Sequence, residues 1–146
     1  MKKGDQKFEI RVRAVIQKDG KFLVCKHKDK SKKYYFLPGG HVEFGETVKE
    51  AIIRELKEEL VISPKEVSLI GGMEDIFTKE GGEKHHDINL FFSVSFDDLE
   101  DKSKEDEIDF VFLTEEEFLN EKVYPLALPR VIAQWQRDKK MFWINN

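Results

Sequence analysis

The sequence predicts an α/β fold with a mixed β-sheet between helices, and two kinds of pattern support this expectation. Apolar and polar residues alternate in several segments, as they do in strands that bury one face. In other segments apolar residues recur every four positions behind a threonine, as in a capped amphipathic helix. The two patterns are interspersed along 146 residues, a length that suits one core, so we expect a single domain over residues 1–146.

Strand patterns occur on both sides of an early turn signal. Residues 8–16 alternate between apolar and polar side chains, which predicts a strand with Arg11 and Arg13 on its second face. The dipeptide at residues 19–20, Asp-Gly, favours a tight turn, so Lys21–His27 is expected to return beside the first strand. Further strands are expected over residues 34–37, 67–78, 86–96 and 108–113.

Two Thr-x-x-Glu capping patterns and two prolines mark the expected helices. Thr47 and Glu50 open the first helix, and Pro64 closes its exit. The buried stripe of this helix is expected to consist of Val48, Ile52, Leu56 and Leu60. Residues 114–117 repeat the capping pattern ahead of a short helix, and residues 129–138 form a final helix that begins with a proline.

The composition argues against several classes of protein. The net charge of −4 disfavours nonspecific binding to a polyanion, so no nucleic acid polymer is expected as a partner. No apolar run approaches the roughly 20 residues of a membrane span, so no membrane association is expected. The single cysteine, Cys25, permits no internal disulfide, which makes a reducing, cytoplasmic location the expectation.

Three glutamates of the first helix lie on one of its edges. Glu55, Glu58 and Glu59 stand at positions i, i+3 and i+4, outside the buried stripe, so their carboxylates are neighbours. Their repulsion, about 0.2–0.5 kcal/mol per pair, is relieved by a cation, and hard divalent ions such as Mg²⁺ take oxygen ligands. A metal held there would suit chemistry on phosphates. The alternatives for such an edge are a solvated face and a surface that docks a partner.

The run GHVEFGETVKEAIIRELKEELVI over residues 40–62 resembles the Nudix box, the signature of the Nudix hydrolases. That pattern is Gly, five residues, Glu, seven residues, Arg-Glu, an apolar residue, any residue, Glu-Glu, any residue, Gly and an apolar residue. The matching positions in this chain are Gly40, Glu46, Arg54, Glu55, Leu56, Glu58, Glu59 and Ile62. Val61 replaces the last glycine of the pattern and is expected to alter the helix exit.

The resemblance implies the Nudix fold, an α/β/α sandwich with a mixed β-sheet. It also implies a Mg²⁺-dependent hydrolase, with Mn²⁺ as a substitute ion, that cleaves a diphosphate linkage in a nucleoside diphosphate joined to another group. Nucleoside triphosphates, oxidised nucleotides, nucleotide sugars and ADP-ribose are substrates of this type, and the chain would act on such a small molecule as a monomer or homodimer. Two alternatives on the same fold stay open: a non-catalytic nucleotide sensor, and an isoprenoid diphosphate isomerase that would use Cys25.

The resemblance assigns metal-binding roles to residues of the box. Glu58 and Glu59 are implied as the principal metal ligands. Glu55 is implied either as a further ligand or as the base that accepts the proton of the attacking water. The carbonyl of Gly39 is implied as another ligand, because a glycine permits close approach of the backbone to an ion.

Three further charged residues are expected to support the site. Arg54 can reach Glu58 four residues on, so it is expected to orient a carboxylate rather than to bind substrate. Glu46 is expected to tie the loop to the helix. Because members of the family often use one more acid from a later loop, Glu107 of the acidic segment 105–107 is a candidate ligand, with a solvated loop as an equal alternative.

Candidates for substrate binding come from three segments: Arg13, Lys26, His27 and Gly40. Lys26 and His27 end a strand near the box and begin a basic loop over residues 26–33. That loop could attract phosphates, although an exposed, solubilising loop is the favoured interpretation. For Arg13, an exposed sheet face is an equal explanation.

Two other groups invite a functional interpretation, but structural roles are favoured for both. His85 and His86 are adjacent in an expected strand and would point to opposite faces, so a hydrogen-bonding or surface role is favoured over a shared metal. Trp135, Phe142 and Trp143 could stack on a nucleobase, but core packing or a dimer contact is favoured.

Overall fold

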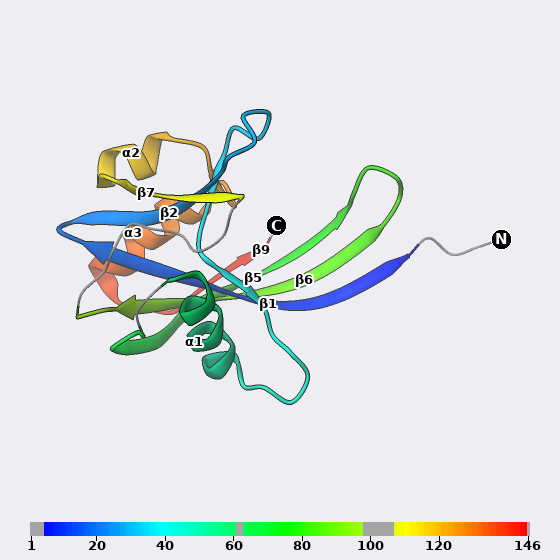
Figure 1. Ribbon diagram of the computed structural model, residues 1–146, viewed down its shortest axis with the longest axis horizontal. Coiled ribbons are helices and arrows are strands. Elements are labelled where there is room, and N and C mark those ends of the chain that lie inside the picture. The colour runs from blue at the N-terminus through cyan, green and yellow to red at the C-terminus, as the bar shows by residue number, and fades with distance from the viewer. Residues whose placement is uncertain (1–4, 61–62, 98–106, 146) are drawn as a thin grey trace.

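The computed structural model describes residues 5–60, 63–97 and 107–145, and within these ranges it contains nine strands and three helices (Figure 1). The strands are β1 (Gln6–Lys18), β2 (Lys21–His27), β3 (Tyr35–Phe36), β4 (Gly39–His41), β5 (Glu66–Thr78), β6 (Lys84–Ser95), β7 (Ile108–Leu113), β8 (Val123–Tyr124) and β9 (Phe142–Asn145). The helices are α1 (Val48–Glu59), α2 (Glu115–Asn120) and α3 (Leu128–Asp138). Within these ranges, every helix is too short or too polar to cross a membrane.

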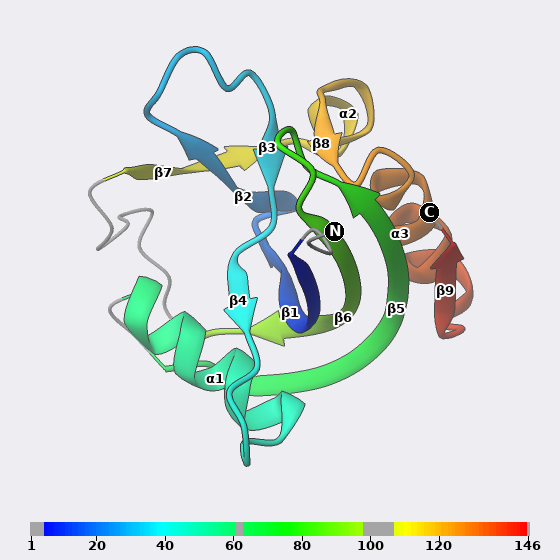
Figure 2. The ribbon, with the colours of Figure 1, turned by 90° about the vertical axis from the view of Figure 1, so that its right-hand side faces the viewer.

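The strands form a curled sheet that divides into two halves, because β1 and β2 diverge soon after their turn (Figures 1 and 2). These two strands pair at Gln17 with Phe22 and at Lys18 with Lys21, beside the predicted turn. Beyond that point β1 continues next to β4 and β6, which extend through β5 to β9. The other half contains β2, β3, β7 and β8. The divergence leaves room between the two halves.

Helices cover both faces of the sheet, as the predicted α/β/α layering requires. α1 lies on one side, and α2 and α3 lie on the opposite side (Figure 2). Ile52, Leu56 and Leu60 of α1 and its end pack into one core cluster, which confirms the predicted stripe. Phe118 of α2 and Ile132 of α3 belong to a second cluster on the other side of the sheet. The predicted fold class is therefore confirmed.

The outer ends of three strands extend beyond the helices as an arm (Figure 1). We call this part, residues 6–10, 74–78 and 84–88, the arm. Within it β1 runs parallel to β6, and β5 runs antiparallel to β6. Because side chains alternate along a strand, the odd-numbered residues of β6 share one face of the arm and the even-numbered residues share the other.

The structure adds three short strands that the sequence analysis did not predict. β4, β8 and β9 have two to four residues each, and they pair with β1, β3 and β5 respectively. Such short segments lack a readable alternation, and their partners lie far away in the sequence. The strand expected over residues 34–37 is shorter, at Tyr35–Phe36, and the final helix begins one residue earlier, at Leu128. Four residues named above lie outside the described ranges: Val61, Ile62, Glu105 and Asp106.

Candidate active site

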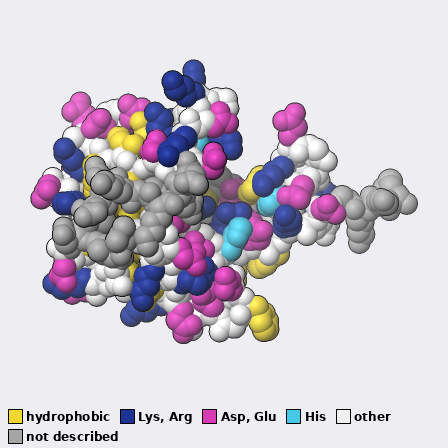
Figure 3. All heavy atoms as spheres, in the orientation of Figure 1, with side chains coloured by type: hydrophobic (Ala, Val, Ile, Leu, Met, Phe, Trp, Pro, Cys, Tyr) yellow, Lys and Arg dark blue, Asp and Glu magenta, His cyan; other side chains and the backbone are white. Residues whose placement is uncertain are grey.

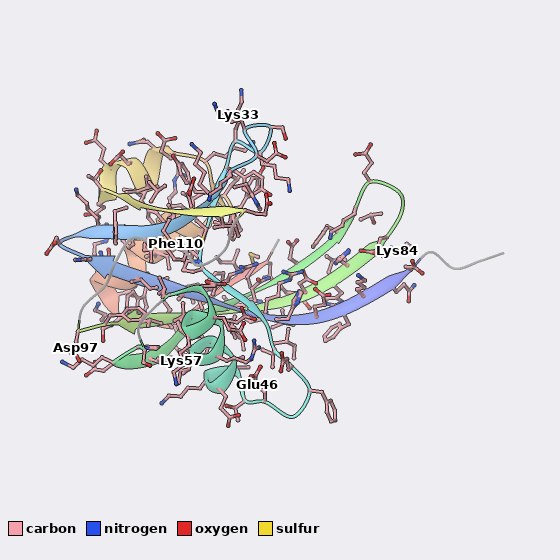
Figure 4. All side chains as sticks on the ribbon, in the orientation of Figure 1. Lys33, Glu46, Lys57, Lys84, Asp97 and Phe110 are labelled. Carbon is pink, nitrogen blue, oxygen red and sulfur yellow. The ribbon has the colours of Figure 1, made fainter. Side chains whose placement is uncertain are left out.

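Side chains that accept hydrogen bonds from backbone amides fix the turn before α1. Thr47 Oγ1 accepts from the Glu50 amide at 3.1 Å, as the capping pattern predicts. Glu46 Oε1 accepts from the Glu43 amide at 3.0 Å, which holds the Glu46 carboxylate beside the turn (Figure 4). Because these contacts are local, the sequence around the turn is sufficient to set where α1 begins.

Arg54 lies at the centre of an ion-pair network at this turn. Its Nε and Nη2 donate to the two carboxylate oxygens of Glu46, at 2.8 and 2.9 Å. Its Nη1 donates to Glu55 Oε1 at 3.0 Å and lies 3.4 Å from Glu58 Oε1. Nη2 also donates to the His41 carbonyl of β4 at 2.9 Å. Hydrogen bonding to Glu46 raises the pKa of Arg54, and hydrogen bonding to Arg54 lowers the pKa of Glu46 to about 2, so both groups stay charged.

The carboxylate of Glu55 lies directly against Gly40 of β4. A Cβ atom at Gly40 would lie 2.6 Å from Glu55 Oε2 and closer still to the other carboxyl atoms. Burial raises the pKa of Glu55, and the hydrogen bond from Arg54 offsets only part of this effect. The adjacent Gly39 has a φ of 151° and packs so tightly on the Val12 carbonyl that a side chain would not fit. The two glycines therefore bring the β4 backbone into contact with the acidic edge of α1.

The three carboxylates of this edge range from exposed to buried. The Glu58 side chain is 59% exposed, whereas Glu59 is 8% exposed. The expectation that Glu59 lies outside the buried part of the helix is therefore wrong, because Glu59 stands seven residues after Ile52 and three after Leu56, on the buried face of α1. Burial lowers the pKa of Arg13 on β1, and the negative charges of Glu59 and Glu55 partly oppose this shift. Carboxylate oxygens and a backbone carbonyl are the donors that a hard divalent cation takes, so the residues of this edge and Gly39 fit such an ion in chemical type.

A cleft of about 1070 Å³ opens between the two halves of the sheet. Gly39 and Gly40 line it, so the cleft meets the Glu55 carboxylate across the Gly40 backbone. The wall formed by β1, β5 and β6 includes Arg11, Arg13, Asp75, Asp87, Asn89 and Phe91. The wall on the side of β2, β3 and β8 includes His27, Lys33, Tyr34, Phe36, Lys122 and Tyr124.

The cleft combines basic side chains with a group of aromatic rings. Five lysine or arginine side chains and two aspartates line it, so positive charge is in excess there. The rings of Tyr34 and Tyr124 meet edge to face at 5.0 Å, and those of His27 and Phe36 are 4.8 Å apart. Lys122 Nζ lies 5.5 Å from the centre of the Tyr124 ring. Aromatic rings of this kind can stack on a base, and the basic groups attract phosphates. Figure 3 shows charges of both signs interleaved over the molecular surface.

Most of the predicted substrate-binding residues lie in the cleft. Arg13, His27 and Gly40 line it, but Lys26 is exposed and is not among the lining residues. The reason is that side chains alternate along β2, so neighbours such as Lys26 and His27 face opposite sides. The basic loop contributes Lys32 and Lys33 to the cleft lining instead, and both are exposed, as the favoured interpretation expects.

Glu107 lies at the turn before β7. It is exposed, and its carbonyl accepts a hydrogen bond from the Lys28 amide at 2.9 Å. The next residue, Ile108, lines the cleft. Within the described ranges no ion pair joins Glu107 to another residue, and its assignment as a further metal ligand stays a prediction.

The remaining candidates differ in how far they are buried. Trp135 and Phe142 pack against the second core cluster, and Trp143 is half-exposed. None of these three rings is among the described residues that line the cleft. His85 is buried and His86 is partly exposed, as expected for neighbours on opposite faces of a strand.

Several cleft residues were missed, because they come from strands far from the box: Asp75, Asp87, Asn89, Lys122 and Tyr124. One signal in the sequence could have found two of them. Residues 85, 87 and 89 are His, Asp and Asn at alternate positions, while the other face of the same strand continues into apolar core residues. Polar residues that alternate along an otherwise apolar strand indicate a face with a polar environment of its own.

The curled mixed sheet thus carries a basic cleft that meets an acidic helix edge across a glycine pair. The sequence profile of the NUDIX domain matches residues 7–135, and the chain therefore belongs to the Nudix family.

Relatives and solved structures agree with this assignment. An ADP-ribose pyrophosphatase of Methanocaldococcus jannaschii is 51% identical over 63 residues, which are 42% of this chain and 37% of that protein. An 8-oxo-dGTP diphosphatase of Escherichia coli is 49% identical over 38 residues, 26% of this chain and 30% of that protein. The matched part thus spans 37% and 30% of the length of these relatives. The crystal structure of a MutT protein from Bacillus halodurans has a TM-score of 0.74 at 17% identity, covering 92% of this chain and 86% of that one, and it shows the same fold.

Proposed function

We propose that this chain is a Mg²⁺-dependent pyrophosphohydrolase that cleaves the diphosphate linkage of a small nucleoside diphosphate derivative. The observation that carries the proposal is the contact between the Glu55 carboxylate and Gly40, because it joins the acidic edge of α1 to the basic, aromatic cleft. The names of the relatives, a pyrophosphatase and a diphosphatase, support the same class of reaction.

In this proposal Glu58 and Glu59 are the principal metal ligands, assisted by the Gly39 carbonyl. A divalent cation bound there supplies charge neutralisation for phosphate oxygens and lowers the pKa of a coordinated water. Glu55 either completes the ligand set or accepts the proton of the attacking water. The second role is favoured by its burial, which raises its pKa toward the range of an effective base. Arg54 positions Glu55 through the hydrogen bond from Nη1.

The cleft suggests how a substrate would lie. The base would stack against the rings of Tyr34 and Tyr124, and the phosphates would lie toward Arg13 and the glycine pair. The volume of about 1070 Å³ lies just above the roughly 300–1000 Å³ typical of small-molecule sites. Such a volume favours a nucleoside diphosphate that carries a second group, as in ADP-ribose or a nucleotide sugar, over a nucleoside monophosphate.

An activity screen tests the proposal directly. The purified chain is incubated with Mg²⁺ and ADP-ribose, nucleotide sugars, nucleoside triphosphates or 8-oxo-dGTP, and released mononucleotide and phosphate are measured. We expect turnover of at least one compound, and a loss of more than about 100-fold in Glu58→Gln, since loss of even an outer partner of a metal ligand costs about 10–100-fold. The matched control is Glu50→Gln, an exposed acid about two turns nearer the start of α1, which should keep wild-type activity.

The same screen separates the hydrolase from a nucleotide sensor on this fold. A sensor would bind one of these compounds tightly and hydrolyse none of them. The presence of Glu55, Glu58 and Glu59 together disfavours that alternative. Turnover that survives within a few-fold in Glu58→Gln would contradict the proposed ligand set.

A further inference from the structure

A second group of metal-ligating side chains lies on the arm, away from α1. His85 and Asp87 of β6 are 3% and 4% exposed, although the arm has no helix above it in Figure 1. Glu9 of β1 stands opposite Asp87 in the parallel register, and it is partly buried. One ligand atom from each of the three residues lies within 4.8 Å of the other two. The Nudix box contributes no residue to this group.

Two buried polar atoms of this group face each other without a hydrogen-bond partner among the described residues. They are His85 Nδ1 and Asp87 Oδ1, which are 4.0 Å apart. The other ring nitrogen, His85 Nε2, lies 2.5 Å from Glu83 Oε1, and a carboxylate can only accept, so Nε2 carries a proton. In the neutral imidazole, Nδ1 is then an acceptor that lies 4.0 Å from a second acceptor, Asp87 Oδ1. Two buried acceptors without a partner are costly, and a cation that both of them coordinate removes this cost.

We propose that Glu9, His85 and Asp87 form a divalent-cation site that binds a zinc ion. Zinc binds imidazole nitrogen and carboxylate oxygen at about 2.0–2.2 Å, so a tetrahedral ion would hold His85 Nδ1 and Asp87 Oδ1 about 3.4 Å apart. The observed 4.0 Å requires only a small closing movement of the two side chains. One imidazole with two carboxylates leaves the fourth position of a tetrahedral zinc open. Asp87 lines the large cleft, so this open position would face the cleft.

The surroundings orient the ligands for this role. Glu83 accepts from the outer nitrogen of His85, which is the carboxylate–histidine arrangement found behind many metal ligands. The ring of Phe77 stacks on His85 at 4.8 Å with an interplanar angle of 11°, which fixes the imidazole plane. Arg11 is the competing cation: its Nη2 lies 2.8 Å from Glu9 Oε2, and its Nε lies 3.3 Å from Asp87 Oδ2. His41 Nε2 also lies 3.1 Å from Glu9 Oε2, so Asp87 Oδ1 is the carboxylate oxygen that these side chains leave for the ion.

The test is zinc binding by the full chain in excess Mg²⁺, which occupies the oxygen ligands of α1. We expect calorimetry to detect one equivalent of Zn²⁺ in the wild type, with at least a tenfold weaker affinity in His85→Gln and in Glu9→Gln. The matched control is His86→Gln, which removes the neighbouring histidine on the opposite face and should bind zinc like the wild type. Glu58→Gln should also bind one equivalent of Zn²⁺. The test of the zinc site on the arm is therefore independent of the metal site proposed on α1.

Two readouts decide the proposal even if a variant does not fold. Long-range ¹H–¹⁵N spectra of the wild type should show that Zn²⁺ shifts Nδ1 of one of the four histidines, a signal that stays in His86→Gln and is absent in His85→Gln. Crystals soaked in Zn²⁺ should give an anomalous peak at bonding distance from His85 Nδ1. The proposal is overturned if the wild type takes up no zinc in excess Mg²⁺, if His85→Gln binds it as tightly, or if a water or a protonated imidazole fills the gap instead.

Discussion

Arg54 and Glu46 form a two-pronged ion pair that links α1 to the turn before it. Nε of Arg54 lies 2.8 Å from one oxygen of Glu46, and Nη2 lies 2.9 Å from the other. The remaining terminal nitrogen, Nη1, donates to Glu55 at 3.0 Å. A planar guanidinium can make all of these contacts at once, so a residue that touches the turn also sets the position of a carboxylate on the proposed catalytic edge.

Arg54→Lys tests this positioning role. A lysine ammonium is a single point charge and cannot reproduce the paired contacts to Glu46 together with the contact to Glu55. We expect kcat to fall by about 10–100-fold, the range typical for residues that orient metal ligands, with a smaller change in KM. The reverse exchange at an exposed site of the same helix, Lys57→Arg, should change neither constant. An Arg54→Lys enzyme within twofold of the wild type would contradict the positioning role.

Glu46 should make the stability of the protein sensitive to acid. Hydrogen bonds from Arg54 and from the Glu43 amide lower its pKa to about 2 in the folded chain, from an ordinary value of 4.5. A carboxylate whose pKa is lower in the folded chain than in the unfolded chain stabilises the fold. This contribution is complete when the pH is above the unfolded-state pKa, and it is lost as the pH falls toward the folded-state pKa. The difference in unfolding free energy between wild type and Glu46→Gln should therefore shrink as the pH falls from about 4.5 to about 2. Urea unfolding of both proteins across this pH range measures the difference in unfolding free energy. A difference that does not change with pH would contradict the role of Glu46.

Gly40→Ala should damage the proposed catalytic edge more than the fold. The new Cβ would lie 2.6 Å from Glu55 Oε2, so the carboxylate must move away from the cleft. We expect kcat to fall by at least about tenfold, because small displacements of a reacting group are costly to catalysis. Gly72→Ala is the matched control, since its Cβ would also lie 2.6 Å from a side chain, here the ring of Trp143 outside the cleft lining. It should lower Tm but leave kcat unchanged.

The elements with long, regular patterns were predictable from the sequence, and the elements that depend on distant partners were not. The stripe of α1 and its threonine cap are local features, and both are present. By contrast, β4 has three residues and exists because it pairs with β1, about 28 positions earlier in the chain. The burial of Glu59, in contrast, was readable from its spacing to Ile52 and Leu56, but the spacing among the three glutamates alone does not show it.

The residues of the candidate site also fall into a locally encoded group and a group that depends on distant strand pairings. The position of Arg54 beside Glu55 and Glu58 was predictable, because these residues lie on one helix. Other residues of the cleft lie on or beside β5, β6 and β8. These strands are placed by the pairings of β6 with β1, β5 with β6 and β8 with β3, which no short motif encodes. Lys26 shows the same limit at a single residue, because its exposure follows from the register of β2.

Tyr34→Ala should weaken substrate binding more than catalysis. Stacking of a base on an aromatic ring is worth about 1–3 kcal/mol by alanine substitution, which corresponds to roughly a fivefold to 150-fold rise in KM. We expect kcat to change by less than about threefold, and Tyr34→Phe to retain the wild-type KM, because the stacking face remains. Trp143→Ala removes a half-exposed ring outside the cleft lining and serves as the control. Equal losses of kcat in Tyr34→Ala and Tyr34→Phe would contradict a stacking role.

The most direct measurement for the central claim is Mg²⁺ binding by the intact chain in the presence of α,β-methylene-ADP, a diphosphate that resists hydrolysis. If the acidic edge of α1 holds a cation beside a diphosphate in the cleft, calorimetry should detect saturable Mg²⁺ uptake that Glu59→Gln abolishes and Glu50→Gln preserves. Wild-type protein that takes up no Mg²⁺ with this ligand, or Glu59→Gln that takes it up equally well, would contradict the claim.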